Sequence, residues 1–520
     1  MTRRRAQRVG VITEPPQETT YLVVGSGAGG APAAAQLAEA TGENVVLVEA
    51  GPDYGPYSRA SWPPELLDAR TLPLSHDWGY NSEQQFADRT IAFERARVLG
   101  GCTAHNGAIQ VRGHRRDYDH WVELGNPGWD TESMLELFLA AEKRLGVWTY
   151  PHDELTPYQR TFFDAAPTAG LPQLDTINDL DEDEGAAPET VNVRDGVRWN
   201  TAFAYLDPLR DTHPNLTICG DILVDSISVK GSRAIAVNAE TPTGRRRIHA
   251  ENVVLAAGAY GTPAILQRSG VGPPQVLERA GIKPLIDSPV GENLHDQAFI
   301  SLEFTGSGEL VRQMNDFESR RGWAADEQVL IKARSAMIDE AFDLHVFPWS
   351  PPGEDGSRRW FLGGACLTPR SRGTLRIQST DPHRQPGIDN AFLCDPAGHD
   401  LGALRSLFAL FRELAAAPAA QQLLGSEIGP SENVRTADEI TSFIRNTVGH
   451  YWHPQGTCRM GPDADPGAVC TPRGQVRGFD NVYVADCSLI PEAPRGFPML
   501  PTIAIAQKVT GWLIGAAHGP

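Results

Sequence analysis

The sequence predicts an α/β fold in which a Rossmann-like nucleotide-binding sheet is combined with a second, mostly antiparallel sheet. An apolar run, a glycine cluster, an Ala-rich helical pattern and a second apolar run follow one another over residues 21–51. Further buried strands of the same sheet are predicted near 216–229, 252–257 and 481–485. Several strand-like runs lie within residues 297–395. We therefore expect the antiparallel domain to be inserted into the first domain and not appended after it.

The first element reads YLVVGSGAGGAPAAAQLAEATGENVVLVEAG and has the form of a βαβ dinucleotide-binding unit. Gly25 lets the chain turn off the strand, Gly27 leaves room for a pyrophosphate, and Gly30 lets the helix pack closely on the strand. The helix N-terminus offers free N–H groups and its positive dipole end to the phosphates. Glu49 ends the second strand, where an acid accepts the ribose hydroxyls. A glycine turn in an ordinary parallel sheet is the alternative, and the position of Glu49 argues against it.

The later elements are predicted from periodicity and buried runs. They are a helix over Asp130–Leu145 capped by Asp130, a strand pair over Leu216–Val229, strands over Asn252–Ala257, Phe361–Pro369, Thr374–Ser379 and Asn481–Ala485, and a core-facing helix over Leu401–Ala417. The nucleotide-binding domain is expected to comprise residues 19–150, 200–296 and 446–520. The second, substrate-binding domain would comprise residues 151–199 and 297–445, and residues 1–18 would form a loose tail.

The composition excludes several classes of partner. The chain has 520 residues and a formal net charge of −19, which argues against nucleic acid and anionic membranes and permits a cationic substrate. Its seven cysteines are scattered, without metal-ligand spacing, so we expect no metal site and no disulfide framework. The basic N-terminus lacks the apolar region of a signal peptide, and no apolar run approaches the length of a membrane span. A cytoplasmic location is the expectation.

Three further segments contain candidate functional residues. Residues 97–113 read RVLGGCTAHNGAIQVRG, residues 451–461 read YWHPQGTCRMG, and residues 482–491 read VYVADCSLIP. With the N-terminal unit and the segments VVLAAGAYGTPAILQRSGVGP and LTPRSRGTLRIQSTDP, they occur in an order that resembles the glucose-methanol-choline oxidoreductase family. The resemblance covers nearly the whole chain.

The resemblance implies an FAD cofactor and assigns residues to it. Gly25, Gly27 and Gly30 would hold the pyrophosphate and Glu49 the adenosine ribose. The remaining cofactor-binding residues would be Arg97, Val224 through its backbone at the adenine, Asp486 near the ribityl–phosphate part, and Gly101, His105 and Asn106 beside the flavin ring.

His453 is the candidate catalytic base. Oxidising an alcohol needs a base for the hydroxyl proton and a hydride acceptor, and a histidine has a pKa near working pH. A lone histidine is more often structural, but His453 matches the base position of the family. His450 and His295 lack such a motif and are interpreted as surface or supporting residues.

Two departures from the family pattern affect the site. The family usually places a second His or Asn opposite the base, whereas the segment here reads RGFPMLPT, so the position falls on Phe497 or Met499. His450 or a polar group of the substrate domain could replace it. The run CTAHN resembles the choline oxidase branch, in which this histidine is bonded to the flavin, so FAD attached covalently through His105 is one expectation. The other is that His105 only packs beside the flavin.

The sequence therefore predicts an FAD-dependent alcohol oxidase or dehydrogenase. The expected substrate is a small amino, sugar or aryl alcohol, and O₂ or another acceptor would reoxidise the flavin. One alternative is an FAD-containing lyase of the same family, like the hydroxynitrile lyases, which the missing second His or Asn leaves open. The other is a non-catalytic flavoprotein.

Overall fold

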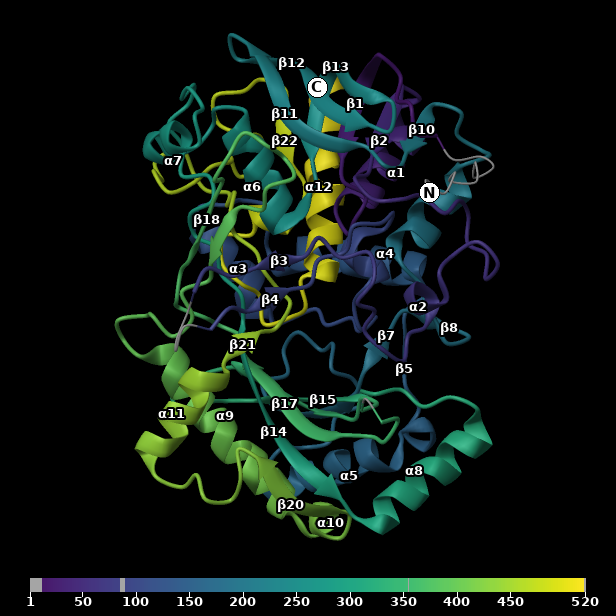
Figure 1. The fold of residues 1–520 in the computed structure, drawn as a ribbon, viewed down its shortest axis with the longest axis vertical. Coiled ribbons are helices and arrows are strands. Elements are labelled where there is room, and N and C mark those ends of the chain that lie inside the picture. Colours follow the sequence, from purple (N-terminus) through teal and green to yellow (C-terminus); the bar gives the residue numbers. More distant parts are fainter. Residues whose placement is uncertain (1–11, 85–88, 354, 519–520) are drawn as a thin grey trace, which may run out of the picture.

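The computed structural model describes residues 12–84, 89–353 and 355–518, so most of the predicted N-terminal tail lies outside the described residues. Two seven-stranded sheets occupy opposite ends of the molecule (Figure 1). Each has its own cluster of buried apolar side chains. The predicted fold class is confirmed.

The first sheet has the strand order β10-β2-β1-β13-β12-β11, with β22 also paired to β13. Its strands β10, β2, β1, β13 and β22 are parallel, whereas β12 and β11 continue the sheet in antiparallel fashion. Parallel strands are buried on both faces, which explains the unbroken apolar run of β2. The bounds are β1 Glu18–Val24, β2 Val45–Val48, β10 Leu216–Cys219, β11 Leu223–Lys230, β12 Arg233–Thr241, β13 Gly244–Leu255 and β22 Val482–Val484.

The predicted strand pair over Leu216–Val229 is only partly right. Both strands exist, as β10 and β11, but β10 pairs with β2 and β11 pairs with β12 at the other end of the sheet. Alternation along a chain indicates a strand and says nothing about its partner, and here the chain crosses the sheet between the two strands.

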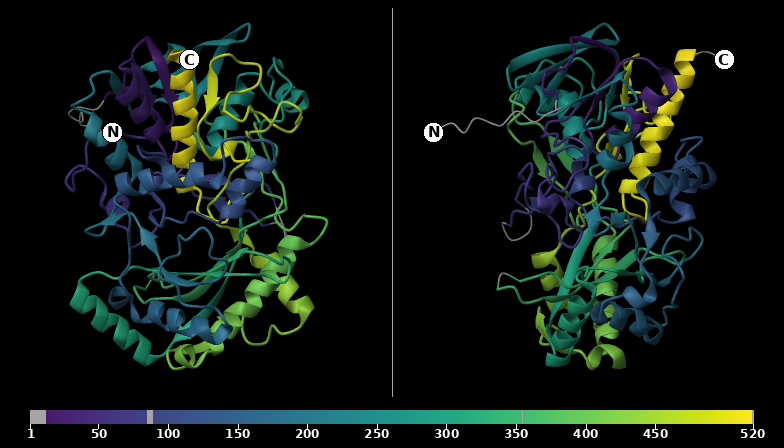
Figure 2. Two further views of the ribbon diagram at one scale, coloured as in Figure 1. Left: turned by 180° about the vertical axis from the view of Figure 1, so that it is seen from behind. Right: turned by 90° about the vertical axis from the view of Figure 1, so that its right-hand side faces the viewer.

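Helices α1 (Gly30–Thr41), α4 (Thr131–Leu145), α6 (Gly258–Arg268) and α12 (Met499–His518) pack around the first sheet. Figure 2 shows α12 running along this half of the molecule when it is viewed from behind and from the side. The α4 prediction is confirmed, including the cap: the Asp130 side chain accepts a hydrogen bond from the Ser133 N–H at 3.0 Å. Among the described residues, no helix has the length and apolar character needed to cross a membrane.

The second sheet is antiparallel, with the order β20-β14-β17-β16-β15-β6, and β21 pairs with β14. Helices α5 (Pro157–Ala165) and α9 (His399–Ala416) pack on it, and α9 confirms the predicted core-facing helix. The strands are β6 Gly185–Pro188, β14 Ala298–Gly306, β15 Val329–Ala333, β16 Leu344–Trp349, β17 Trp360–Cys366, β20 Leu424–Gly429 and β21 Gly449–His450.

The strand predicted at Thr374–Ser379 does not join this sheet. It forms β18 (Thr374–Arg376), which makes a separate two-stranded sheet with β19 (Gly387–Asp389). The remaining α-helices and strands are α2 Pro64–Leu67, β3 Tyr80–Asn81, β4 Ala92–Phe93, α3 Arg115–Glu123, β5 Trp148–Thr149, β7 Thr190–Val191, β8 Val193–Arg194, β9 Val197–Arg198, α7 Pro274–Arg279, α8 Gly308–Arg321, α10 Pro418–Gln421 and α11 Ala437–Thr447.

Candidate active site

The glycine cluster after β1 meets a second glycine pair across a narrow gap. Gly25 turns the chain with φ +94°, and a Cβ on it would lie 2.5 Å from the Ala256 carbonyl oxygen. A Cβ on Gly27 would lie 3.7 Å from the Gly101 Cα, an ordinary contact, whereas a Cβ on Gly101 would lie 2.7 Å from the Gly27 Cα. Gly30 has no room for a side chain, since its Cβ would lie 1.8 Å from the Gly25 oxygen. Backbone is therefore exposed at Gly27, where the sequence predicts a pyrophosphate.

Glu49 is buried at the end of β2 and anchors this loop. One carboxylate oxygen accepts from the Ser26 N–H at 3.0 Å and the Ser26 hydroxyl at 2.6 Å, and the other accepts from the Gly51 N–H at 2.9 Å. Burial raises the pKa of Glu49, although these three hydrogen bonds oppose the shift. A carboxylate has about four acceptor positions, so one remains for a ribose hydroxyl. Arg97 is held beside it through a hydrogen bond from its Nε to the Ala50 oxygen at 3.1 Å.

Asp486 and Val224 are two further predicted cofactor residues, and both belong to the half of the chain that builds the first sheet. The Asp486 carboxylate accepts from the Gly258 N–H at 2.8 Å, the Thr262 hydroxyl at 2.6 Å, and the N–H and hydroxyl of Ser488 at 2.8 and 2.6 Å. Its side chain therefore ties β22 to α6, and any cofactor contact falls to its backbone. Val224 lies on β11 beside a shift in strand register, which takes backbone groups out of the ladder.

A buried amide that the sequence motifs missed completes the glycine-lined gap. Asn200 is fully buried, and its Nδ2 has no hydrogen-bond partner among the described residues. Its Oδ1 lies 3.2 Å from the position of a Cβ on Gly100. An unpartnered buried donor beside exposed glycine backbone fits a phosphate-bearing cofactor. Asn200 has no phosphate-binding motif, so only its place in the fold reveals it.

His105 and Asn106 follow the short 3₁₀ helix Gly101–Ala104. His105 is buried, and its Nε2 donates to the Ser75 carbonyl oxygen at 2.6 Å. Burial lowers the pKa of His105, so the ring is neutral and the lone pair lies on Nδ1. The Asn106 side chain accepts from the Ala108 N–H at 3.0 Å and donates to the Met499 sulfur at 3.3 Å.

His453 lies where the chain crosses from β21 of the second sheet towards β22 of the first (Figure 1). Its Nδ1 lies 2.6 Å from the Gln297 Oε1. The Gln297 amide is fixed because its Nε2 donates to the carbonyl oxygens of Leu367 at 3.1 Å and Pro494 at 3.2 Å. Gln297 can therefore only accept at Oε1, so His453 carries its proton on Nδ1 and its lone pair on Nε2.

The surroundings keep this imidazole neutral. Burial, and then the neighbouring Arg95 and His450, hold the pKa of His453 well below its ordinary value. The backbone is fixed as well, since the N–H groups of Tyr451 and His453 both donate to Asp296 Oδ1, at 3.3 and 3.0 Å. The structure thus presents an oriented, unprotonated nitrogen.

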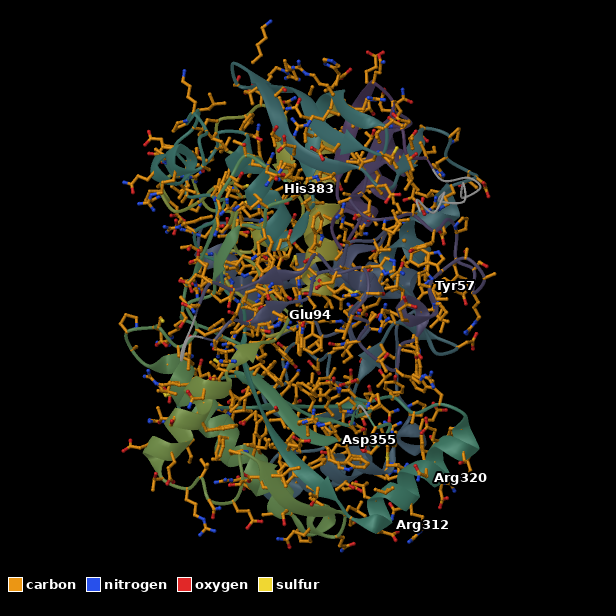
Figure 3. The ribbon with its side chains drawn as sticks, viewed as in Figure 1. Tyr57, Glu94, Arg312, Arg320, Asp355 and His383 are labelled. Carbon is orange, nitrogen blue, oxygen red and sulfur yellow. The ribbon has the colours of Figure 1, made fainter. Side chains whose placement is uncertain are left out.

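The interpretation of His450 and His295 as possible surface residues is wrong, because both are buried. His450 Nε2 pairs with Glu94 at 3.5 Å, and the Trp452 Nε1 donates to the same carboxylate at 2.9 Å. Figure 3 places Glu94 at mid-height, between the two sheets. Burial lowers the pKa of His295 to about 3, and its Nδ1 bonds the Asn293 oxygen at 2.8 Å.

Of the two residues left as alternatives for the position opposite His453, one is aromatic and lies against the histidine. The Phe497 ring lies 4.9 Å from the His453 ring, while Met499 faces Asn106 and Gln110. The Tyr451 ring lies 4.7 Å from His453 and stacks against two further rings, Phe347 at 5.8 Å and Phe299 at 6.0 Å. His453 is therefore lined by the aromatic rings of Tyr451 and Phe497.

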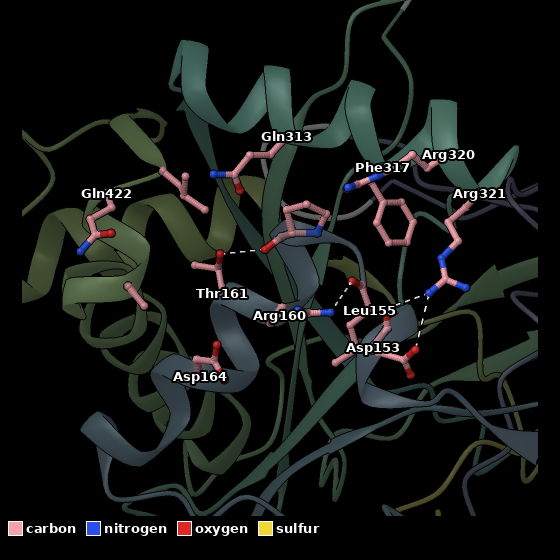
Figure 4. A pocket seen from close by; sticks show the side chains of 13 residues that line it. Asp153, Leu155, Arg160, Thr161, Asp164, Gln313, Phe317, Arg320, Arg321 and Gln422 are labelled. Atoms are coloured by element: carbon pink, nitrogen blue, oxygen red, sulfur yellow. Dashed lines mark hydrogen bonds and ion pairs between the residues drawn. The ribbon is translucent and has the colours of Figure 1, made fainter.

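Two other features lie apart from this site. A surface hollow of about 790 Å³ opens between α5 and α8 and contains none of the predicted site residues (Figure 4). Cys366, His399 and Asp400 place one potential ligand atom each within 4.8 Å of one another. Both Asp400 oxygens accept backbone N–H groups, of Arg370 at 2.8 Å and Ser371 at 3.0 Å, so the carboxylate already has a structural task.

Comparison with known proteins identifies the family. The sequence matches the N-terminal part of the GMC oxidoreductases over residues 19–299 and their C-terminal part over residues 369–506. The chain is a GMC oxidoreductase.

Its relatives extend over nearly all of its length. It is 30% identical to the oxygen-dependent choline dehydrogenase of Photobacterium profundum over 545 aligned positions, covering 95% of this chain and 93% of that protein. The corresponding Vibrio vulnificus protein is also 30% identical, covering 96% and 94%. The solved structure of pyridoxine 4-oxidase from Mesorbium loti is 26% identical, with a TM-score of 0.84 over 96% of this chain and 100% of that one.

These similarities confirm the predicted family, the FAD cofactor and the general reaction. The GMC oxidoreductase described here is an FAD-dependent enzyme that oxidises alcohols. The role of each site residue and the domain boundaries stay predictions.

Proposed function

We propose that His453 removes the hydroxyl proton of a small alcohol while the carbinol carbon is oxidised. The observation that carries the proposal is the tautomer fixed by Gln297, which leaves the lone pair on His453 Nε2. When bound, FAD supplies the hydride acceptor for this reaction. Gln297 holds the ring in orientation, and Tyr451 and Phe497 place apolar ring surface beside it.

The same aromatic rings support a proposal about the substrate. Among the amino, sugar and aryl alcohols that the sequence leaves open, rings on several sides of the base favour an aryl group or an organic cation over a sugar. Aromatic faces attract both, whereas a sugar needs many polar partners.

A screen of alcohols with and without oxygen tests this function. Substrates should bleach the flavin anaerobically and yield the carbonyl product, and restored colour on adding air would identify O₂ as an acceptor. Cleavage of a hydroxynitrile without bleaching would instead favour the lyase alternative.

The pH profile gives a specific prediction. A base acts when unprotonated, and the lowered pKa of His453 means that it becomes protonated only well below its ordinary pKa of about 6.5. We therefore expect kcat/KM for the alcohol to stay level as the pH falls through that range, since this ratio reports the free enzyme. A loss of kcat/KM with a midpoint at or above about 6.5 would contradict a base that is already neutral in this range.

We further propose that FAD is attached through His105. Support comes from its position directly after the 3₁₀ helix Gly101–Ala104 and from its neutral ring. Attachment through Nε2 would require the bond to Ser75 to be released, whereas Nδ1 is already unprotonated.

Acid precipitation is the direct measurement of attachment. The flavin colour should remain in the protein pellet, and His105→Ala should release it to the supernatant. Colour found only in the supernatant of the parent protein, with an intact mass lacking FAD, would leave His105 as a packing residue.

A cytoplasmic location is also proposed. Its support is that the cysteines, all of them within the described residues, are free thiols.

A further inference from the structure

One arginine side chain is buried completely beside the residues predicted to line the flavin ring. Arg198 ends β9, and no part of it is exposed to solvent. Its guanidinium nitrogens donate to the backbone carbonyl oxygens of Leu66 at 2.9 Å, of Thr71 and of Asn106. Because Asn106 directly follows His105, the guanidinium lies against the loop where the flavin ring is expected.

No carboxylate of the described residues neutralises this guanidinium. Within the part of the chain that the structure describes, Arg198 makes no ion pair, and Asp68, whose backbone pairs with Val197, is bound by Arg70. The two Asp68 oxygens accept from the Arg70 Nε at 2.9 and 3.0 Å. Burial lowers the pKa of Arg198 to about 10 despite the nearby charge of Asp68, so the group is charged at neutral pH. Arginine is seldom buried completely without an acidic partner, because an isolated interior charge is costly.

The guanidinium is also held in a fixed position. Leu66 lies in α2 and Thr71 follows this helix, so two of the three hydrogen bonds go to one segment. Backbone contacts tie the same segment to the strand of Arg198, since the Ala69 N–H donates to the Gly196 oxygen at 3.0 Å. A charge fixed in this way needs no rearrangement when an opposite charge forms beside it.

The strand of Arg198 reaches the predicted cofactor site at two points. At the first, the pKa of His105 is lowered mainly by burial, and the charge of Arg198 adds to this effect. At the second, Asn200 lies beside Gly100, and its Nδ2 has no hydrogen-bond partner among the described residues. Arg198 therefore places a positive charge next to the ring end of a segment whose other end faces the predicted phosphates.

Hydride transfer from an alcohol brings negative charge to this site. The hydride carries two electrons and one proton to the flavin, while the hydroxyl proton stays on the base, so the flavin ring gains one negative charge. We propose that Arg198 stabilises this reduced, anionic flavin through its charge and so raises the reduction potential of the bound cofactor. The inference goes beyond the proposed role of His453 and rests on the place predicted for the ring beside His105 and Asn106.

Equilibration of the FAD-loaded enzyme with a reference dye tests the proposal. At neutral pH and a fixed ratio of reduced to oxidised dye, Arg198→Gln should lower the ratio of reduced to oxidised flavin by about 10-fold, because charges inside a protein interact strongly across several ångströms. Arg198→Lys keeps a positive charge and should stay close to the parent ratio. Arg194→Gln is the control, since this exposed arginine of the neighbouring strand β8 packs over the Trp199 ring at 4.2 Å.

A purely structural role of Arg198 gives a different result. If it only anchored the segment that carries α2, Arg198→Gln and Arg198→Lys would both lose stability or flavin, and the flavin that remained would keep the parent ratio. Such an unchanged ratio in Arg198→Gln would overturn the proposal. Should that variant bind no flavin, the parent enzyme decides. Its reduced flavin should keep an anionic absorbance spectrum at mildly acidic pH, where reduced FAD in solution is neutral, and a neutral spectrum would overturn the proposal.

This inference and the proposed catalytic base can fail separately, because dye equilibration needs no alcohol. If Arg198→Gln lowers the flavin ratio while alcohol reduces His453→Ala at the parent rate, the inference about Arg198 stands and the proposed base falls. If His453→Ala is slow and Arg198→Gln keeps the parent ratio, the inference about Arg198 falls alone. Acid precipitation of the parent and of His105→Ala reports independently whether the ring lies beside His105.

Discussion

His453→Ala is expected to keep its FAD and to be reduced by alcohol about 10²–10⁴-fold more slowly than the parent enzyme, which is the usual contribution of a positioned acid or base. The FAD should remain because the phosphate and ribose contacts predicted at Gly27 and Glu49 are made by other segments of the chain. Anaerobic stopped-flow measurement of flavin bleaching separates this step from reoxidation.

A histidine outside the site serves as the control. His383 is exposed and pairs with Glu240 at 2.7 Å. It lies in the part of the molecule that contains the first sheet (Figure 3). His383→Ala should be reduced at the parent rate. If His453→Ala is also reduced at the parent rate, the proton is removed by another group.

Gly27→Phe is expected to yield protein without bound flavin. The first side-chain carbon fits, since it would lie 3.7 Å from the Gly101 Cα, but the ring must then fill the gap where the pyrophosphate is predicted. Absorbance would give the flavin bound per chain, and circular dichroism would show whether the variant folds. Gly515→Phe is the control, because Gly515 lies in α12 with open space around its Cβ. Normal flavin content in Gly27→Phe would contradict the cofactor site.

The features that the sequence predicts well are those encoded in short segments. Three such features belong to one βαβ unit, so the residues that determine them are close in sequence. They are the turn at Gly25, the close packing at Gly30 and the acid at Glu49. The structure has each of them in the expected conformation. The Asp130 cap and helix α9 are equally local.

The features that the sequence misses depend on contacts between distant segments. Gln297 orients His453 from 156 residues away, and an amide at the start of a strand carries no motif of its own. The sequence leaves Phe497 and Met499 as alternatives; in the structure Phe497 lies against His453, whereas Met499, at the start of α12, contacts Asn106. His450 is buried because Glu94 from another segment pairs with it. Burial of this kind cannot be inferred from composition or spacing.

The reductive half-reaction tests the central claim most directly. The FAD-loaded enzyme is mixed anaerobically with an alcohol, or with the same alcohol deuterated at the carbinol carbon, and the oxidised flavin absorbance is followed in parent and His453→Ala protein. We predict that the parent flavin bleaches with formation of one carbonyl product per flavin, more slowly with the deuterated alcohol, and that His453→Ala is slowed throughout. Product formation without bleaching, or equal rates in the two proteins, would contradict hydride transfer assisted by His453.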